Sequence, residues 1–176
     1  REKILQEIKE VAREFLDRCN YEGKQIFDLI NRTIVKFEMN EITIHPADFL
    51  VVLSTTDHEI ACEVCNHIIS DTSKPLANYL EFLLSGIRGK DENTAIRLTE
   101  IAVNSGDLIL CRSVAEGYAY RGWAFRLKSE EIKIIEKLLN SLDTDTRRLA
   151  IESLGHFPDT QKNEAIELAL SIEIGD

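Results

Sequence analysis

The chain has 176 residues, and its hydrophobic content of 44% is sufficient for a folded core, which excludes a disordered chain. Its 21 Lys and Arg residues against 31 Asp and Glu residues give a net charge of −10, which disfavours broad, nonspecific binding to nucleic acid. Because there are only three prolines and eight glycines, helix-breaking residues are scarce, and the composition predicts an all-α protein.

The first predicted helices follow from apolar residues spaced three and four positions apart. This spacing predicts an amphipathic helix over 4–19 and a second helix over 26–37. Residues 41–45 are expected to form an extended connection. Pro46 suits the first turn of the next helix, because its missing N–H needs no partner there.

Capping signals predict two helices in the middle of the chain. Thr56 and Glu59 fit a capping box, in which each side chain binds the other's backbone N–H, ahead of a helix over about 57–70. Pro75 is expected to begin another helix. The apolar face of that second helix carries Leu76, Tyr79, Leu80, Leu83, Leu84 and Ile87.

The remaining helices are also predicted from caps and periodicity. Asp91 is expected to cap a helix that stops at Gly106, and the segment 108–120 is apolar nearly all round, as in a buried helix. Ser129 and Asp143 are predicted to cap two further helices. The apolar residues assigned to the Asp91-capped helix are Ala95, Leu98, Ile101 and Ala102, and those assigned to the last helix are Ala165, Ile166, Ala169 and Leu170.

A weak internal repeat relates two of these helix pairs. A shift of 36 residues (143 − 107) aligns Asp107 with Asp143 and the two Asn-Ser pairs that precede them. The same shift matches Leu98, Ala102 and Val103 with Ile134, Leu138 and Leu139, and after a one-residue slip Arg112, Val114, Ala115 and Ala119 match Arg147, Leu149, Ala150 and Leu154. The repeating unit is therefore predicted to be a pair of antiparallel helices.

The second copy of this repeat reads LLNSLDTDTRRLAIESLGHF and resembles the HEAT-repeat (armadillo-like) family. The resemblance implies a right-handed α-solenoid of about nine helices with a binding groove, and it carries no catalytic residue. In that family an aspartate of the turn and an arginine of the second helix stack into a polar ladder between repeats. The matching residues here are Asp143 with Arg147 or Arg148, and more loosely Asp107 with Arg112.

The sequence also predicts how the chain divides into regions and where in the cell the protein is found. We expect residues 1–45 to form an N-terminal helical pair with its connector, and residues 46–176 to form the HEAT-like region. Since no apolar run approaches the ~20 residues of a membrane span and the first residues do not resemble a secretory signal, we expect a cytoplasmic protein. Arg1 as the first residue and Met39 as the only methionine suggest a piece of a longer protein.

Two motifs are candidates for metal-binding or redox sites. His58, Cys62 and Cys65 share one helical face and invite a zinc or redox interpretation, but both cysteines fall in or beside the apolar stripe, so core packing is favoured. The acidic turn at Asp143 lacks the ligand spacing of a calcium loop and is interpreted as a helix cap. No phosphate loop or nucleophile motif is found, and we expect neither metal, cofactor nor enzymatic activity.

The segment 118–128 stands out as a candidate binding surface. It reads YAYRGWAFRLK and gathers aromatic and basic side chains within an acidic chain. Because aromatic residues and arginine dominate binding hot spots, the segment is the candidate for partner binding, while the favoured alternative is that Trp123 and Phe125 fold over the hydrophobic ends of two repeats with the arginines in solvent. The candidate residues are Tyr118, Tyr120, Arg121, Trp123, Phe125 and Arg126.

The favoured function is a non-enzymatic scaffold module that binds a protein or peptide along its groove. One alternative is a sensor or regulatory arm of a larger bacterial signalling NTPase, which rests on fold-level analogy. Another is a HEAT-like protein of DNA alkylation repair, which the net charge disfavours.

Overall fold

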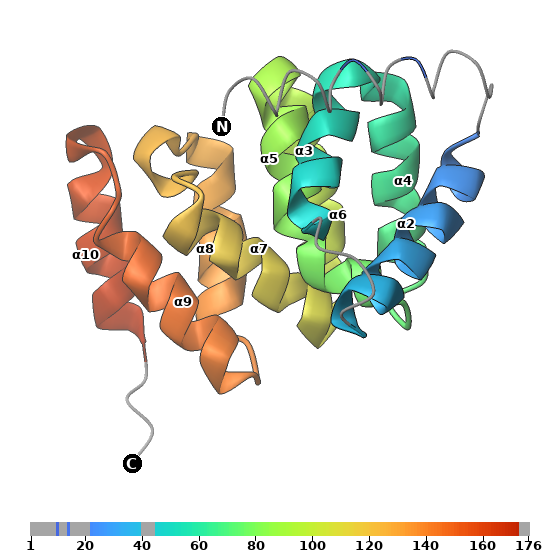
Figure 1. The fold of residues 1–176 in the computed structure, drawn as a ribbon. Helices are drawn as coiled ribbons and strands as arrows, with labels where there is room; N and C mark the ends of the chain where they lie inside the picture. The colour runs from blue at the N-terminus through green and yellow to red at the C-terminus, as the bar shows by residue number, and fades with distance from the viewer. Residues whose placement is uncertain (1–9, 11–13, 15–21, 40–44, 173–176) are drawn as a thin grey trace. The chain divides into compact units, whose positions relative to one another are not determined.

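The structure of the chain is a computed structural model that describes residues 10, 14, 22–39 and 45–172 (Figure 1). Apart from residues 10 and 14, the predicted helix over 4–19 lies outside these described residues, and so does the predicted connection over 41–45 apart from residue 45. Within the described ranges every regular element is helical and no β-strand occurs, which confirms the all-α class for that part of the chain. No helix in these ranges has both the length and the apolar character that a bilayer crossing requires.

The described part of the chain contains nine α-helices and four 3₁₀ turns. The α-helices are α2 (Gly23–Glu38), α3 (Pro46–Thr56), α4 (His58–Ser70), α5 (Leu80–Lys90), α6 (Glu92–Asn104), α7 (Leu108–Tyr120), α8 (Ile132–Leu139), α9 (Thr144–Leu154) and α10 (Lys162–Ser171). The 3₁₀ turns are η1 (Pro75–Tyr79), η2 (Ala124–Arg126), η3 (Ser129–Glu131) and η4 (Asp159–Gln161).

The chain divides into two compact units, Arg1–Leu98 and Thr99–Asp176. The division falls inside α6, at a point where neither repeats nor composition predicted one. The expected division after residue 45 stays a prediction.

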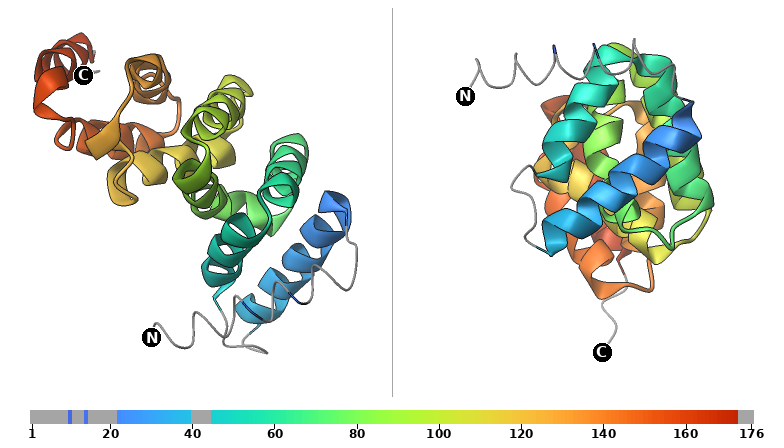
Figure 2. Two further views of the ribbon diagram at one scale, coloured as in Figure 1. Left: turned by 90° about the horizontal axis from the view of Figure 1, so that it is seen from above. Right: turned by 45° about the vertical axis from the view of Figure 1, so that its right-hand side comes forward.

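In the first unit, helices that are two apart in the sequence lie side by side. α2 packs against α4, and α3 packs against α5. α2 also crosses over α3 and α4, as the right-hand view of Figure 2 shows. The apolar stripe predicted for the second helix is confirmed, since α2 buries Ile26, Phe27, Ile30 and Ile34.

Polar side chains join the elements of this unit at two places, and at a third place two helices pack closely at a glycine. Asn31 of α2 donates its amide to the Phe27 carbonyl at 2.9 Å and accepts the Leu76 N–H of η1 at 3.0 Å. Glu63 of α4 accepts the Gly23 N–H at the start of α2 at 2.8 Å. A Cβ added at Gly86 of α5 would lie 1.6 Å from the Ser54 hydroxyl of α3, so only glycine allows these two helices to pack this closely.

Four aspartates cap the helices that follow them. Asp57, Asp91, Asp107 and Asp143 each accept a backbone N–H from the first turn of α4, α6, α7 and α9 respectively. These carboxylates satisfy N–H groups that have no partner inside the helix. The predicted caps at Asp91 and Asp143 are confirmed.

Three local predictions need correction. Thr56 is the last residue of α3, and Asp57 caps α4 in its place, because its carboxylate reaches the Ile60 N–H at 3.0 Å. Ser129 lies inside η3 and caps no α-helix through its side chain. The helix expected to begin at Pro75 opens as the 3₁₀ turn η1 and becomes α-helical only at Leu80.

In the second unit, α9 is the central helix. α7 runs beside α9, and both α8 and α10 pack against it. α10 buries Ala165 and Leu168, whereas Ile166 and Leu170 are exposed, so the predicted apolar face of this helix was wrong. Ile101 of α6, assigned to the apolar face of its helix, is likewise exposed.

The two turns that the repeat aligns have the same local structure. Ser105 accepts the Asp107 N–H at 3.2 Å, and Ser141 accepts the Asp143 N–H at the same distance of 3.2 Å. In both turns the aspartate then caps the next helix. The matched apolar positions Leu98, Ala102, Val103, Ile134, Leu138 and Leu139 are all buried.

Candidate functional site

The segment 118–128 contains the end of α7, a turn at Gly122, η2 and the approach to η3. Gly122 has a φ of 75°, a conformation that residues with a side chain rarely adopt, and it reverses the chain directly after α7. Along the segment, buried and exposed side chains come in pairs: residues 118–119 and 123–124 are buried, whereas residues 120–121 and 125–126 are exposed.

The inward side chains form a buried cluster. Tyr118 donates its hydroxyl to the Glu131 carboxylate at 2.7 Å, and the Trp123 ring meets the Tyr118 ring edge to face at 5.3 Å between centroids. Glu131 accepts the Lys128 N–H through its other oxygen at 3.0 Å. A Cβ added at Gly117 would lie 2.4 Å from the Trp123 ring, so the indole packs directly against the α7 backbone.

This cluster changes the role of two predicted site residues. Tyr118 and Trp123 were expected to bind a partner, but their side chains are buried, with Trp123 only 3% exposed. A buried ring offers no area to a partner, so both residues serve to hold the segment in place. The alternative of packing over the repeat is correct for Trp123.

The outward side chains form an exposed set. Tyr120 is 54% exposed and Phe125 is 61% exposed, and the neighbouring Arg121 and Arg126 are exposed as well. The Phe125 ring lies over the His156 ring of the turn after α9, with centroids 4.9 Å apart. The structure therefore brings four of the six predicted residues to the surface, next to the end of α9.

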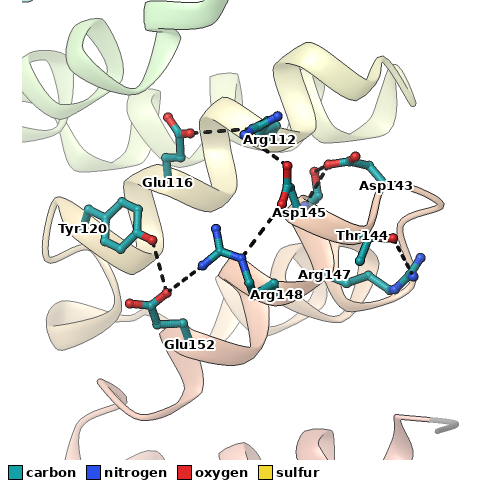
Figure 3. Close-up of polar contacts among 10 residues, drawn as sticks. Arg112, Glu116, Tyr120, Asp143, Thr144, Asp145, Arg147, Arg148 and Glu152 are labelled. Carbon is teal, nitrogen blue, oxygen red and sulfur yellow. Dashed lines mark hydrogen bonds and ion pairs between the residues drawn. The ribbon is translucent and has the colours of Figure 1, made fainter.

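A polar network on α7 and α9 extends this surface (Figure 3). Arg148 of α9 pairs with Glu152 at 3.5 Å and with Asp145 at 3.9 Å, and the Tyr120 hydroxyl donates to Glu152 at 3.2 Å. Glu152 thus lies between the Tyr120 phenol and the Arg148 guanidinium. Both charged side chains are about half exposed, so a partner can reach them.

Farther along the two helices, Arg112 joins α7 to α9. Its guanidinium pairs with Asp145 of α9 at 3.2 Å and with Glu116 of its own helix at 3.8 Å (Figure 3). Exposed pairs of this kind contribute little to stability, about 0.2–1 kcal/mol each. Their main effect here is to hold the arginine side chains in fixed directions on the surface.

The link between the helices differs from the ladder that the HEAT resemblance implied. Asp143 accepts the Thr146 hydroxyl at 2.7 Å and the Thr146 N–H at 2.8 Å, while Arg147 donates to the Ser141 carbonyl at 2.6 Å. The hydrogen bonds from Thr146 hold the pKa of Asp143 below its usual range, and the nearby Arg112 lowers it further. The ion pair between helices is therefore made by Asp145 in place of Asp143.

The sequence missed Glu131, Asp145 and Glu152 as members of this region. Glu131 lies in a segment that the sequence predicted only as the start of a helix, and its carboxylate is fully buried. The one sequence feature that could have indicated them is helical spacing, because Asp145 and Glu152 lie at positions i−3 and i+4 from Arg148, where ion pairs form along a helix.

The cysteine motif packs into the first unit. The Cys62 sulfur lies 3.8 Å from His58 Nε2, and Cys65 is buried in the α4 core, where burial raises the pKa of its thiol. Burial also raises the pKa of Cys62. Among the described residues, no three His, Cys, Asp or Glu side chains are grouped so that they can hold a metal ion.

Comparisons of the chain with protein-family models, with curated proteins and with solved structures find no match.

Proposed function

We propose that the chain is a HEAT-like helical-repeat module that binds a protein or peptide partner, and that the contact lies at the ends of α7 and α9. We call this region the arginine–aromatic surface. It consists of Tyr120, Arg121, Phe125, Arg126, Arg148, Glu152 and His156.

The observation that carries the proposal is the exposure of Tyr120 and Phe125 on a segment whose backbone is fixed from below. Large aromatic side chains are usually buried, and exposed ones beside arginines are the composition of binding hot spots. Trp123 and Tyr118 anchor the segment in the core, so the exposed rings are held in place before a partner arrives. Such preorganisation reduces the entropy lost on binding.

Two features support the repeat arrangement. α2 with α4, α3 with α5 and α7 with α9 each lie side by side while the intervening helix lies in another layer, as in stacked helical hairpins. The turns at Asp107 and Asp143 also share their serine and aspartate hydrogen bonds. In a HEAT-like array, α7 and α9 would be second helices of neighbouring pairs and would line the same face.

The test is selection of binders from a displayed random-peptide library on the purified chain. Selected peptides are then measured against Phe125→Ala and Arg126→Glu. Leu142→Ala and Lys133→Glu serve as matched controls, because both residues are exposed elsewhere on the second unit.

We expect the two surface variants to lose binding while their thermal unfolding stays unchanged, and the two controls to bind as the parent chain does. Recovery of no binders, or equal binding by all four variants, would overturn the proposal.

A further inference from the structure

The charge of the arginine–aromatic surface is opposite to that of the chain as a whole. Residues 118–128 contain three basic side chains, Arg121, Arg126 and Lys128, and no acidic one, in a protein of net charge −10. Arg148 adds a fourth cation from α9. At physiological salt, charges act over only about 8 Å, so a short ligand responds to this local excess and a long polyanion also meets the acidic remainder.

We propose, on the basis of the function proposed above, that the partner segment is an acidic peptide, and that Glu152 is an internal competitor for its carboxylates. Glu152 places one carboxylate between the Arg148 guanidinium and the Tyr120 hydroxyl. A carboxylate of the partner would make the same two interactions from outside. The site therefore already holds the chemical group that it is expected to recognise.

The geometry favours carboxylates over other ligand groups. A guanidinium presents paired N–H donors that match the two oxygens of a carboxylate, and the pairing is stronger where an aromatic ring excludes water from one side. Phe125, whose ring contacts that of His156, precedes Arg126 in the sequence, and Tyr120 precedes Arg121, so an exposed ring neighbours each arginine along the chain. An acidic peptide with apolar residues between its carboxylates fits both kinds of group.

If Glu152 competes with the partner, a substitution inside the site should increase its affinity for the peptide. Removing the Glu152 charge should strengthen the binding of an acidic peptide, because Arg148 and Tyr120 become available to it. Removing the Arg148 charge should weaken binding. A purely structural role of the pair would give no gain of affinity from either change.

The experiment measures the affinity of a short fluorescent peptide of alternating glutamate and phenylalanine by anisotropy at physiological salt, where the peptide responds to the local charge. The matched control for Glu152→Gln is Glu136→Gln on α8, which changes the net charge equally at another exposed position. We expect Glu152→Gln to tighten binding about two- to five-fold, the change that one exposed ion pair gives, and Arg148→Gln to weaken it similarly. Glu136→Gln should leave the affinity unchanged.

Several outcomes would overturn this inference. The first three are that the peptide does not bind, that a peptide with glutamine in place of glutamate binds equally well, and that a single-stranded DNA oligonucleotide binds more tightly than the acidic peptide. Equal changes of affinity from Glu152→Gln and Glu136→Gln would also overturn it. If the glutamine peptide binds and Phe125→Ala abolishes that binding, the proposed peptide-binding function stands and only the acidic character of the partner is lost.

Discussion

The inward and outward sides of segment 118–128 each carry two aromatic residues, and these pairs have opposite roles. Tyr118 and Trp123 face the core of the second unit, while Tyr120 and Phe125, each two residues farther on, face solvent. The difference arises at the end of α7 and the turn at Gly122: the buried residues 118–119 are followed by the exposed 120–121, and after the turn the buried 123–124 are followed by the exposed 125–126. A cluster of aromatic residues in a sequence therefore marks a region, and only the backbone decides which of its members are available to a partner.

The largest expected effect is that of removing the inward indole. Trp123→Ala should destabilise the chain by about 3–5 kcal/mol, because it leaves a cavity against Gly117 and Tyr118. Phe125→Ala, on the exposed side, should change stability by no more than about 0.5 kcal/mol. Urea denaturation followed by circular dichroism measures both, and similar losses for the two variants would contradict the inward and outward assignment.

A smaller and more specific contrast compares the two tyrosine hydroxyls. Tyr118→Phe removes a donor from the buried Glu131 carboxylate and should cost about 1–3 kcal/mol. Tyr120→Phe removes only the exposed bond to Glu152 and should cost less than about 0.5 kcal/mol. The same denaturation measurement applies, and since each change removes only a hydroxyl group, a small loss at Tyr118 would argue against the buried hydrogen bond.

The smallest expected effect concerns the cap of α9, away from the segment. Asp143→Ala should cost about 1 kcal/mol, whereas Asp143→Asn should keep most of the cap, since asparagine is an equally good capping residue. The folded pKa of Asp143 is lowered, so its charge contributes stability that is fully present above the unfolded pKa of about 3.9 and is lost as the pH falls toward the folded value.

This sign gives a pH test of the cap. The stability difference between the parent chain and Asp143→Asn should be constant above about pH 5 and should shift in favour of the asparagine variant as the pH falls below about 4. Thermal unfolding over this pH range measures it. A pH-independent difference would show that the Thr146 hydrogen bonds do not depend on the carboxylate charge.

Much of the fold was predictable because helical periodicity is a local property. The predicted helix over 108–120 has the observed bounds of α7, and the caps at Asp91 and Asp143 were found because a capping bond spans only three residues. Thr56 failed as a cap because Asp57, one position later, competes with it and has the stronger acceptor. The face of α10 was wrong except at Ala165, because Ile166 with Leu170 and Ala165 with Leu168 both follow helical spacings, of four and three positions, and only packing against α9 chooses between them.

The candidate site was less predictable, since its geometry depends on residues far apart in the chain. Tyr120 and Phe125 were visible as exposed candidates only together with Tyr118 and Trp123. Glu131, Glu152 and His156 are the contacts that distinguish the buried from the exposed aromatic residues. Glu131 lies 13 residues after its hydrogen-bond donor Tyr118, and Glu152 lies 32 residues after Tyr120. Composition identifies the right segment, and tertiary contacts assign the roles within it.

The bond between Glu63 and the Gly23 amide has a consequence for the order in which the first unit assembles. In the first turn of α2, the Gly23 N–H donates to the carboxylate of Glu63, which lies 40 positions later in the chain on α4. This N–H therefore lacks its acceptor until the ribosome has added residue 63. A Cβ at Gly23 would collide with Glu63, at 2.3 Å, so the approach is close enough to tolerate only a hydrogen atom there. The beginning of α2 is therefore completed by docking onto α4, and amide exchange at Gly23 should report that docking event.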